Sequence, residues 1–481
     1  MWVKQKKYLL WLVPGLLLII LTAGCGSGNP NPLKNNLLNF GHLEHLYERI
    51  QMNHRTVGII HIYSEAPDYG WMGARGEGIT CVDDVARAAV LYLRQYRSNG
   101  DETYFKKSRS LIRFVMAMQA SNGLFYNFLL PDHRINKTRR NSVNRLDFWT
   151  ARAVWALGEG YLISKDRHPT FADSLRKSLE RVLPVVQKLI QQFPKTEIVA
   201  GKRYPTWLIN RYAADATSEL LLGLVAFEKA TADPVLKDAI EKLSVGLIAM
   251  QQGDWQQVPY GAHLSYPGIW HGWGNAQTEV LSRIGKDLNF PKAVASAKKE
   301  ADGFFSRLLI DGWKSSILLS DSVQIKEFPQ IAYEVRTVAL GLENLYKVTG
   351  EKKYAVLAGL AGSWFLGNNS AGSVMYDFKT GRCFDGIESR RKVNLNSGAE
   401  STIEALLTLQ ALQSRPVIRN YLFFLNRSKR KTVRRRNGDF IIYRRYLNKA
   451  REKVFVSLNL NTGKMNIRNA DAWDRFIKSK N

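Results

Sequence analysis

Acidic and polar residues cluster at six points along this chain, each close to the start of an apolar segment. The clusters centre on Asp83 and Asp84, Asp147, Asp215, His271, Glu334 and Glu400. A pair of carboxyl groups can protonate a leaving oxygen and activate water or attack a carbon, which is the chemistry that cleaves glycosidic bonds. The clusters therefore supply candidate acid–base residues, provided that the fold brings them together.

Tryptophan, arginine and amide side chains accompany these carboxylates. Aromatic faces can stack on the apolar faces of sugar rings, and Asp, Asn and Arg can bind sugar hydroxyl groups. The candidate substrate-binding residues are Trp71, Asp147, Trp149, Arg211, Asp215, Trp270, His271, Trp273, Asn275, Tyr333, Arg336 and Arg391. A single Asp at a helix start is more often a cap. Capping, however, does not require the accompanying tryptophans and arginines.

The clusters are separated by nearly even intervals of roughly 60 to 68 residues, which is typical of one structural unit repeated along the chain. Each cluster leads into a segment with helical apolar spacing, and a second, amphipathic helix follows. This second helix is clearest at Glu102–Met118, Pro234–Met250 and Lys352–Phe365. Six such hairpins predict an all-α fold, an (α/α)6 toroid over residues 42–413. An open helical solenoid would show the same period, but it would spread its polar groups along a concave face.

The N-terminus has the pattern of an export signal. Three lysines precede an apolar run from Tyr8 to Leu21, and small residues follow. The sequence LTAGC, which ends at Cys25, resembles the lipobox of bacterial lipoproteins, in which the cysteine is lipidated. We expect residues 1–25 to be a lipoprotein-type signal peptide and residues 26–41 a flexible tether. The protein would then be exported and anchored on the extracytoplasmic side of a membrane, although a plain signal peptide with an incidental cysteine is the alternative.

The net charge of +27 is concentrated in a C-terminal extension, residues 414–481. From Arg415 onward there are 19 basic and 4 acidic residues, including the run RSKRKTVRRR. Such a segment could bind anionic lipid headgroups or an acidic polysaccharide, or could be solvated without a ligand. Because the chain carries an export signal, we do not expect nucleic acid as a partner. Alternating apolar residues in DFIIYRRYL and KVFVSLNLNTGKMNIR predict a small β-hairpin here.

Two further cysteines, Cys81 and Cys383, precede the first and the sixth inner helices. These helices are neighbours only if the ring closes, so we expect the two residues to lie close together. Export permits a disulfide between them, and two separate buried thiols are the alternative.

Two stretches carry a more specific resemblance. GITCVDDVARAAVLYL, and SWFLGNNSAGSVMYDFKTGRCFDGIES followed by VNLNSGAESTIEALLTLQ, resemble the helical-toroid domain that bacteria attach to glycosyltransferases of polysaccharide synthesis. The six hairpins are similar to the six-hairpin glycosidase superfamily. This resemblance implies a toroid and a carbohydrate ligand, but superfamily members include hydrolases, lyases and epimerases, so it does not settle the reaction.

These observations favour a glycoside hydrolase that trims an extracellular or envelope polysaccharide. In a closed ring Asp83 or Asp84 would face Glu400, with Asp84 as base and Glu400 as acid, and with Glu334, Asp147 and Asp215 in reserve. A polysaccharide lyase could instead use His271 with Tyr333 or Arg336, and a binding or assembly lipoprotein would need no catalytic pair. The expected ligand is an oligo- or polysaccharide, with or without anionic groups. No cofactor or metal is expected, since no HExxH or Cys/His spacing occurs.

Overall fold

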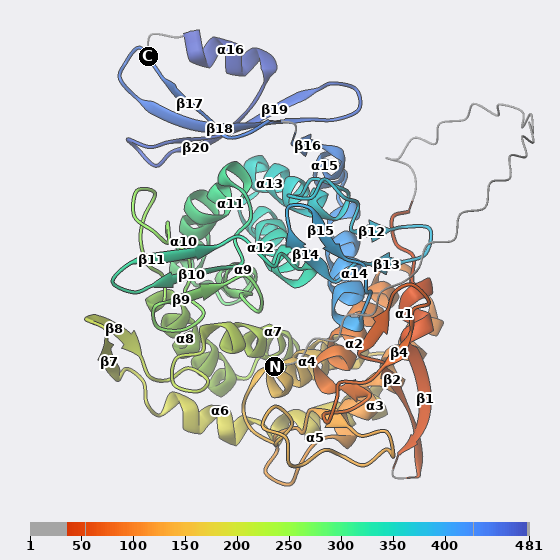
Figure 1. The fold of residues 1–481 in the computed structure, drawn as a ribbon. Helices are drawn as coiled ribbons and strands as arrows, with labels where there is room; N and C mark the ends of the chain where they lie inside the picture. Colours follow the sequence, from red (N-terminus) through yellow and green to blue (C-terminus); the bar gives the residue numbers. More distant parts are fainter. Residues whose placement is uncertain (1–35, 53, 427, 479–481) are drawn as a thin grey trace, which may run out of the picture. The chain divides into compact units, whose positions relative to one another are not determined.

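Six long helices form an inner ring in the computed structural model, which describes residues 36–52, 54–426 and 428–478. The inner helices are α2 (Val82–Asn99), α4 (Phe148–Ser164), α7 (Ala214–Thr231), α9 (Gln277–Asp287), α12 (Ala332–Thr349) and α14 (Ala399–Gln413). Each packs against the next, and α14 packs against α2, as Figure 1 shows. The ring therefore closes, which confirms the predicted toroid and excludes the open solenoid.

Outer helices complete the hairpins. They are α3 (Glu102–Ala117), α5 (Pro169–Glu180), α6 (Leu183–Ile190), α8 (Pro234–Ala249), α10 (Pro291–Glu300), a π-helical turn (Ala301–Phe305), α11 (Ser306–Asp311), α13 (Lys352–Gly362), a 3₁₀ turn (Ser363–Phe365), α15 (Pro416–Arg419) and a second 3₁₀ turn (Asn420–Phe423). The three second helices expected from sequence correspond to α3, α8 and α13. The sixth outer position is filled differently, because α15 is short and α1 (Gly41–Leu46) also packs on α14.

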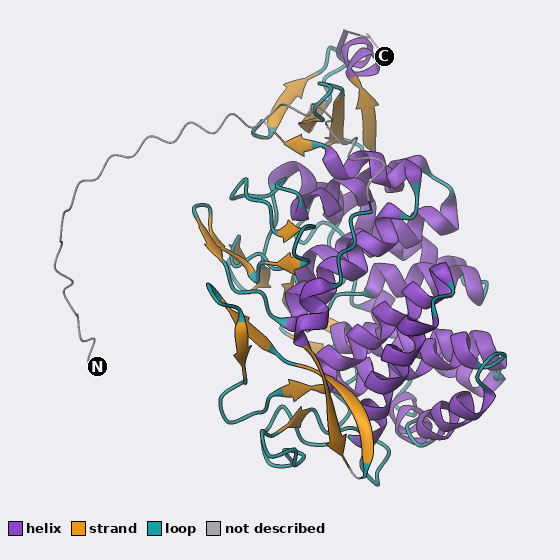
Figure 2. Cartoon of the chain, turned by 90° about the vertical axis from the view of Figure 1, so that its right-hand side faces the viewer, coloured by secondary structure: helices purple, strands orange, loops and turns teal. Residues whose placement is uncertain are grey.

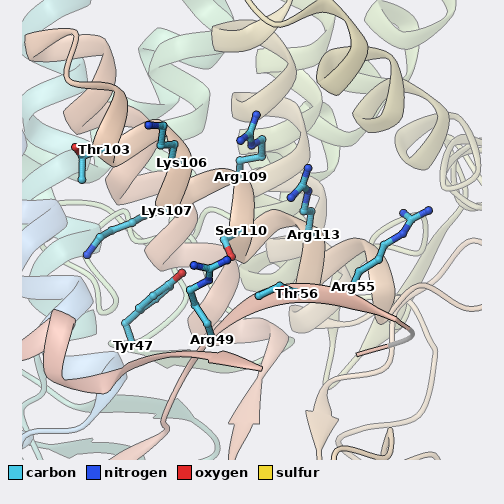
Figure 3. Close-up of a pocket in the computed structure, with 10 residues that line it drawn as sticks. All are labelled: Tyr47, Arg49, Arg55, Thr56, Thr103, Lys106, Lys107, Arg109, Ser110 and Arg113. Carbon is cyan, nitrogen blue, oxygen red and sulfur yellow. The ribbon is translucent and has the colours of Figure 1, made fainter. Parts of the chain in front are cut away.

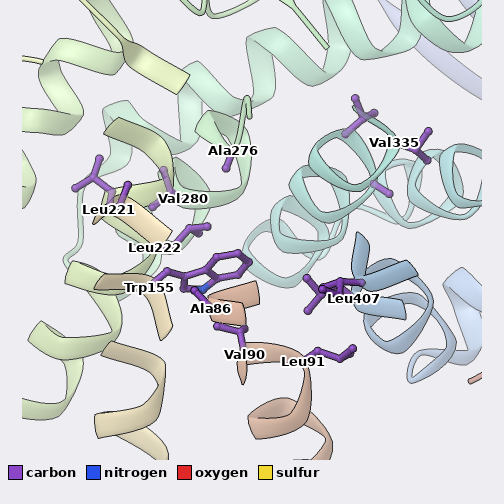
Figure 4. Packing of buried hydrophobic residues seen from close by; sticks show 14 of the residues in the cluster. Ala86, Val90, Leu91, Trp155, Leu221, Leu222, Ala276, Val280, Val335 and Leu407 are labelled. Carbon is purple, nitrogen blue, oxygen red and sulfur yellow. The ribbon is translucent and has the colours of Figure 1, made fainter. Parts of the chain in front are cut away.

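The inner helices are buried on nearly every face, as a ring between solvent-facing helices requires. Figure 4 shows apolar side chains that the inner helices contribute to this core, among them the fully buried Trp155. Helices α4 and α7 approach most closely at two glycines. A Cβ atom on Gly158 would lie 2.2 Å from Gly223 O, and one on Gly223 would lie 2.3 Å from Val154 O. Only glycine permits this approach.

Short antiparallel sheets lie at the ends where the inner helices begin, on one side of the helices in Figure 2. They are β1 (Tyr47–Met52) with β2 (Arg55–Ile60); β3 (Tyr63–Glu65) with β4 (Gly70–Met72); β5 (Thr80–Cys81) with β6 (Phe128–Leu129); β7 (Thr196–Val199) with β8 (Lys202–Pro205); β9 (Ile269–His271) with β10 (Ser316–Leu319) and β11 (Val323–Lys326); β12 (Tyr376–Asp377) with β13 (Arg382–Cys383); and β14 (Gly386–Ser389) with β15 (Lys392–Asn394). Among these strands, β2 of the β1–β2 hairpin packs on the outer helix α3.

The C-terminal extension is larger than the predicted hairpin. It is a five-stranded antiparallel sheet of β16 (Leu425–Asn426), β17 (Lys431–Arg434), β18 (Phe440–Leu447), β19 (Lys453–Asn459) and β20 (Met465–Asn469), followed by α16 (Ala470–Lys478). Trp473 of α16 stacks on Phe455 at a ring-centroid distance of 4.7 Å. On the ring side, the hydroxyl of Tyr446 donates to the carbonyl of Leu309 at 2.6 Å. The sheet therefore belongs to the same compact unit as the ring, Asn36–Asn481.

The possible disulfide between Cys81 and Cys383 is not formed. Both are buried free thiols. The Sγ of Cys81 donates a hydrogen bond to Asp84 Oδ2 at 3.2 Å, and Cys383 belongs to a different cluster of the apolar core. Burial raises the pKa of both thiols well above the ordinary value, which disfavours the thiolate needed for oxidation.

None of the described helices is long and apolar enough to cross a membrane. The predicted signal peptide with Cys25, and the first part of the predicted tether, lie outside the described residues.

Candidate active site at the mouth of the ring

A cavity of about 420 Å³ opens at the end of the ring where the inner helices begin. Its walls carry two carboxylates, two tryptophans, two asparagines, an arginine and a tyrosine. The lining residues are Asp83, Asn127, Phe128, Asn141, Phe148, Trp149, Arg152, Trp273, Ile331, Tyr333 and Glu400. The first turns of α2, α4, α12 and α14 contribute to it, so unpaired N–H groups and helix dipoles face this end. Five of the predicted site residues meet here: Asp83, Trp149, Trp273, Tyr333 and Glu400.

Asp83 and Glu400 are the two carboxylates of the cavity. Asp83 is oriented by two donors: Arg152 Nη1 lies 2.5 Å from Oδ1, and Asn127 Nδ2 lies 2.9 Å from Oδ2. The side chain of Glu400 is 46% exposed, and only its Oε2 is held among the described residues, by Arg87 at 3.3 Å. One carboxylate is therefore fixed, and the other keeps a free oxygen at the cavity surface.

Asp84, the residue preferred as base on sequence grounds, is turned away from the cavity. It is 4% exposed, its Oδ1 lies 2.6 Å from Arg87 Nη2, and its Oδ2 accepts from Cys81. Burial raises the pKa of Asp84, and the neighbouring Arg87 offsets part of that rise. Asp83 and Glu400, from the helices on either side of the seam, both line the cavity, whereas Asp84 does not line it and instead binds Arg87.

Arg336 also lies beneath the cavity and cannot reach a ligand. It is fully buried, with Glu219 Oε1 at 2.7 Å, Glu279 Oε2 at 3.2 Å and Glu404 Oε2 at 2.6 Å from its nitrogens. Above it, the Tyr333 hydroxyl donates to Glu219 at 2.8 Å and accepts from Arg152 at 2.7 Å. Burial raises the pKa of Tyr333, with Arg152 opposing the rise. The expected roles of Arg336 in substrate binding and in a lyase are therefore wrong, because its guanidinium is fully buried among three buried carboxylates.

His271 lies in β9, six residues before α9 begins, rather than at a helix start. Its Nε2 is 3.0 Å from Asp215 Oδ2, and its Nδ1 is 2.8 Å from the carbonyl oxygen of Trp273. The imidazole stacks on the Trp273 ring at 3.7 Å. Asp215 and His271 consequently support Trp273, which is 42% exposed at the cavity wall. None of the eight histidines, all of which the structure describes, lines the cavity.

Glu334 is a buried carboxyl group beside the cavity. It is 1% exposed, and neither carboxyl oxygen has a partner with hydrogen-bond geometry among the described residues. Burial raises the pKa of Glu334 well above its usual range, and the backbone of Ile331 offsets only part of the rise. Its side chain lies against Gly272, where a Cβ atom would be 2.5 Å from Glu334 Cγ. The burial that raises this pKa favours the protonated form of Glu334, and the side chain does not line the cavity.

The other predicted binding residues lie outside the cavity. Trp270 is part of the core and 2% exposed, Asp147 caps α4, and Asn275 donates a hydrogen bond to Ser265 within its loop. Trp71 is exposed on β4 and stacks on His61. Arg211 pairs with Glu197, and Arg391 is exposed in the turn between β14 and β15. Capping and core packing account for Asp147 and Trp270.

Sequence reasoning missed Asn127, Asn141, Phe148 and Arg152. Arg152 had a signal, since it is the only basic residue in a largely apolar helix, FWTARAVWALGEGYLIS. Asp385 was missed as well: its Oδ1 accepts from Gly398 N at 2.8 Å and from Ser401 Oγ at 2.6 Å. It thereby fixes the start of α14, which carries Glu400. Burial raises the pKa of Asp385.

No cluster of three or more potential metal ligands occurs in the part of the chain that the structure describes.

The fold is similar to that of several solved sugar-converting enzymes. A cellobiose 2-epimerase from Bacillus thermoamylovorans B4167 matches with a TM-score of 0.55 and 11% identity, over 79% of this chain and 97% of that one. The cellobiose 2-epimerase from Spirochaeta thermophila DSM 6192 has a TM-score of 0.51 and 12% identity, over 79% and 98%. A D-mannose isomerase has a TM-score of 0.52 and 12% identity, over 74% and 92%. At these identities the similarity establishes the toroid fold alone. No protein-family model and no curated protein matches the chain.

Proposed function

We propose that this protein is a carbohydrate-active enzyme, a glycoside hydrolase whose site is the mouth cavity. The observation that carries the proposal is that carboxylates from adjoining helices, Asp83 of α2 and Glu400 of α14, line one cavity with Trp149 and Trp273. Two carboxyl groups flanking a bound sugar are what glycosidic cleavage requires, and aromatic walls suit the apolar faces of sugar rings.

The two carboxylates differ in a way that suggests their roles. Asp83, fixed by Arg152 and Asn127, is the base or nucleophile, because a nucleophile must be held in one orientation. Glu400, with a free oxygen at the cavity surface, is the acid that protonates the leaving oxygen. The proposed substrate is an extracellular or envelope polysaccharide. The solved epimerases of similar fold are named for a disaccharide, cellobiose, which supports a sugar as the ligand of this fold.

Epimerisation or isomerisation is the rival reaction, because the similar structures carry those names. It requires a base that removes a proton from a sugar carbon. Both nitrogens of His271 are engaged, by Asp215 and by Trp273, and no histidine lines the cavity. The same contacts weigh against a lyase that uses His271. A glycan-binding protein without catalysis remains the alternative from another class.

The test is to incubate the purified full-length protein with a panel of neutral and anionic oligosaccharides. New reducing ends support a hydrolase, a new unsaturated product indicates a lyase, and a changed sugar composition without cleavage indicates an epimerase. Asp83→Asn and Glu400→Gln should each abolish hydrolysis. Asp147→Asn is the matched control, because it keeps a helix cap at the same end of the ring but lies outside the cavity. Full activity in either cavity variant would remove that residue from the mechanism.

We also propose that the protein is exported and lipid-anchored at Cys25. The support is the sequence LTAGC after a short basic and apolar leader. In cells fed a labelled fatty acid, the wild-type protein should acquire label and fractionate with membranes, and Cys25→Ser should do neither. Unchanged labelling of Cys25→Ser would refute the anchor.

A further inference from the structure

A second cavity lies on the outside of the ring, between the β1–β2 hairpin and helix α3. Its volume is about 790 Å³, and ten residues line it: Tyr47, Arg49, Arg55, Thr56, Thr103, Lys106, Lys107, Arg109, Ser110 and Arg113. Six of them are basic and none is acidic. We call it the basic groove; Figure 3 shows its charged side chains arriving from both walls. It shares no residue with the mouth cavity.

The spacing of residues on α3 places three cations on one wall. Lys106, Arg109 and Arg113 are separated by three and four positions, so they lie along one face of the helix. With a rise of 1.5 Å per residue, this row extends about 10 Å along the axis. Arg49 and Arg55 face it from the hairpin. A ligand that met all of these charges would carry several negative groups.

Glycine brings the two walls together. A Cβ atom on Gly58 of β2 would lie 2.7 Å from Tyr47 Cε2 and 3.0 Å from Ser110 Oγ of α3. The hairpin therefore rests directly on the helix at the inner end of the groove, and the floor carries the hydroxyl groups of Thr56 and Ser110. Hydroxyl groups on the floor can bind the oxygens of a polar ligand.

Five of the six cations of the groove form no ion pair among the described residues. Lys107 pairs with Glu44, but Arg49, Arg55, Lys106, Arg109 and Arg113 form no ion pair with a carboxylate among the described residues. The residues outside the description include no Asp or Glu. Burial, with Arg109 and Arg55 nearby, lowers the pKa of Arg113. The groove thus holds crowded like charges that a bound anion would relieve.

The groove continues beyond its first cavity. A neighbouring cavity of about 600 Å³ shares Arg55, Arg109 and Arg113 with it and extends to Phe171 and Ser174 of α5. The two together form an elongated path rather than a pocket for one small ion.

We infer that the basic groove binds an anionic stretch of polysaccharide, a run of uronate or similarly charged sugars, outside the mouth of the ring. The choice of a glycan among polyanions rests on the proposed function. A flat membrane surface fits less well, because the groove is walled on both sides and none of its lining residues is an exposed large apolar side chain that could insert into lipid. A polysaccharide bound in the groove would hold the enzyme on its charged substrate.

Direct binding to the full-length protein tests the inference without any need for catalysis. The probe is a fluorescently labelled oligogalacturonate, and the matched probe is its methyl ester, which has the same sugars without the charges. The acidic oligomer should bind and should dissociate as salt is raised, whereas the ester should bind at least about tenfold more weakly, since each charge-assisted contact is worth more than a neutral one. Equal affinity for both probes would overturn the inference.

Two variants locate the binding. Arg109→Gln with Arg113→Gln changes the helix wall, and Arg49→Gln with Arg55→Gln changes the hairpin wall; each should weaken binding of the acidic oligomer about tenfold or more. Lys188→Gln with Lys292→Gln removes the same charge from exposed sites on α6 and α10 and is the control. An equal loss in the control would show diffuse charge attraction and refute the groove.

Competing ligands and the mouth variants separate the remaining outcomes. Tighter binding to single-stranded DNA or to phosphatidylglycerol vesicles than to the oligomer would assign the groove to another partner and overturn the inference. Asp83→Asn should bind the oligomer as the wild type does. If the wild type binds the oligomer in the groove but hydrolyses no glycan, only the proposed function is refuted. If the wild type hydrolyses a glycan but the groove variants bind the oligomer as tightly as the wild type does, only the groove is refuted.

Discussion

Replacing Arg336 by methionine tests the electrostatic network on the axis of the ring. Burial alone would lower the pKa of Arg336, but Glu404, Glu219 and Glu279 together raise it above the ordinary value. All four side chains are fully buried, and the three carboxylates lie 2.6 to 3.2 Å from the guanidinium. Methionine has a similar length and no charge, so Arg336→Met would leave these carboxylates without their shared cation.

The expected cost is about 3–5 kcal/mol of unfolding free energy, the range for removing one partner of a buried ion pair. Urea unfolding followed by far-ultraviolet circular dichroism and by tryptophan fluorescence measures it. Arg176→Met is the control, because Arg176 pairs with Asp173 and Glu180 on the exposed surface of α5. It should leave the unfolding midpoint almost unchanged.

The pH dependence provides the sharper test. Burial raises the pKa of Glu404, and Arg336 is the largest opposing influence. Without Arg336, this carboxyl should bind a proton more readily in the folded state. A group with a raised folded pKa favours folding below its unfolded pKa of about 4.3 and loses that contribution as pH rises. The deficit of Arg336→Met should therefore be smaller at about pH 5 than at about pH 8, and a deficit below about 1 kcal/mol, or one independent of pH, would refute the buried network.

Three further outcomes follow from the structure. Glu334→Gln should match the wild type in unfolding free energy near pH 4 and should exceed it increasingly as pH rises. The reason is that the raised pKa of Glu334 in the folded protein makes its ionisation oppose folding. A constant difference across a pH series of urea titrations would contradict this. Gly223→Ala should cost about 1–3 kcal/mol in the same assay, since its Cβ would meet Val154 O, and an unchanged midpoint would show that α4 and α7 can separate freely. Cys81 and Cys383 should react with a thiol reagent only after denaturation and without prior reduction, and failure to react then would indicate a disulfide.

The toroid could be predicted because its signals are local and repeated. Apolar spacing is visible within a single hairpin, and the recurrence of the hairpins gives the period; the structure places α3, α8 and α13 at the expected positions. The fourth repeat shows the limit of this reasoning. Its polar cluster at His271 lies in strand β9, and α9 starts at Gln277. A polar cluster predicts the polar end of the ring, but it does not distinguish a helix start from the loop before it.

The orientation of single side chains could not be predicted. Asp83 and Asp84 are neighbours in the first turn of α2, but consecutive helical residues point about 100° apart, so one faces the cavity and the other faces the seam. The residue that faces the cavity is decided by the two arginines that bind these carboxylates. Arg87 binds Asp84 and Arg152 binds Asp83, and the two arginines come from different helices. Likewise, Trp273 and Trp270 have the same local setting, but one is 42% exposed at the cavity and the other is core.

Arg87 connects the closure of the ring to the chemistry of the mouth. Its guanidinium lies 2.6 Å from Asp84 of α2, 2.6 Å from Glu404 of α14 and 3.3 Å from Glu400 at the cavity. The first and last inner helices are thus joined by the same side chain that orients one proposed catalytic carboxylate. One partner of Arg87 is 46% exposed at a cavity, so the position of Glu400 relative to Asp83 depends on how tightly the ring is closed.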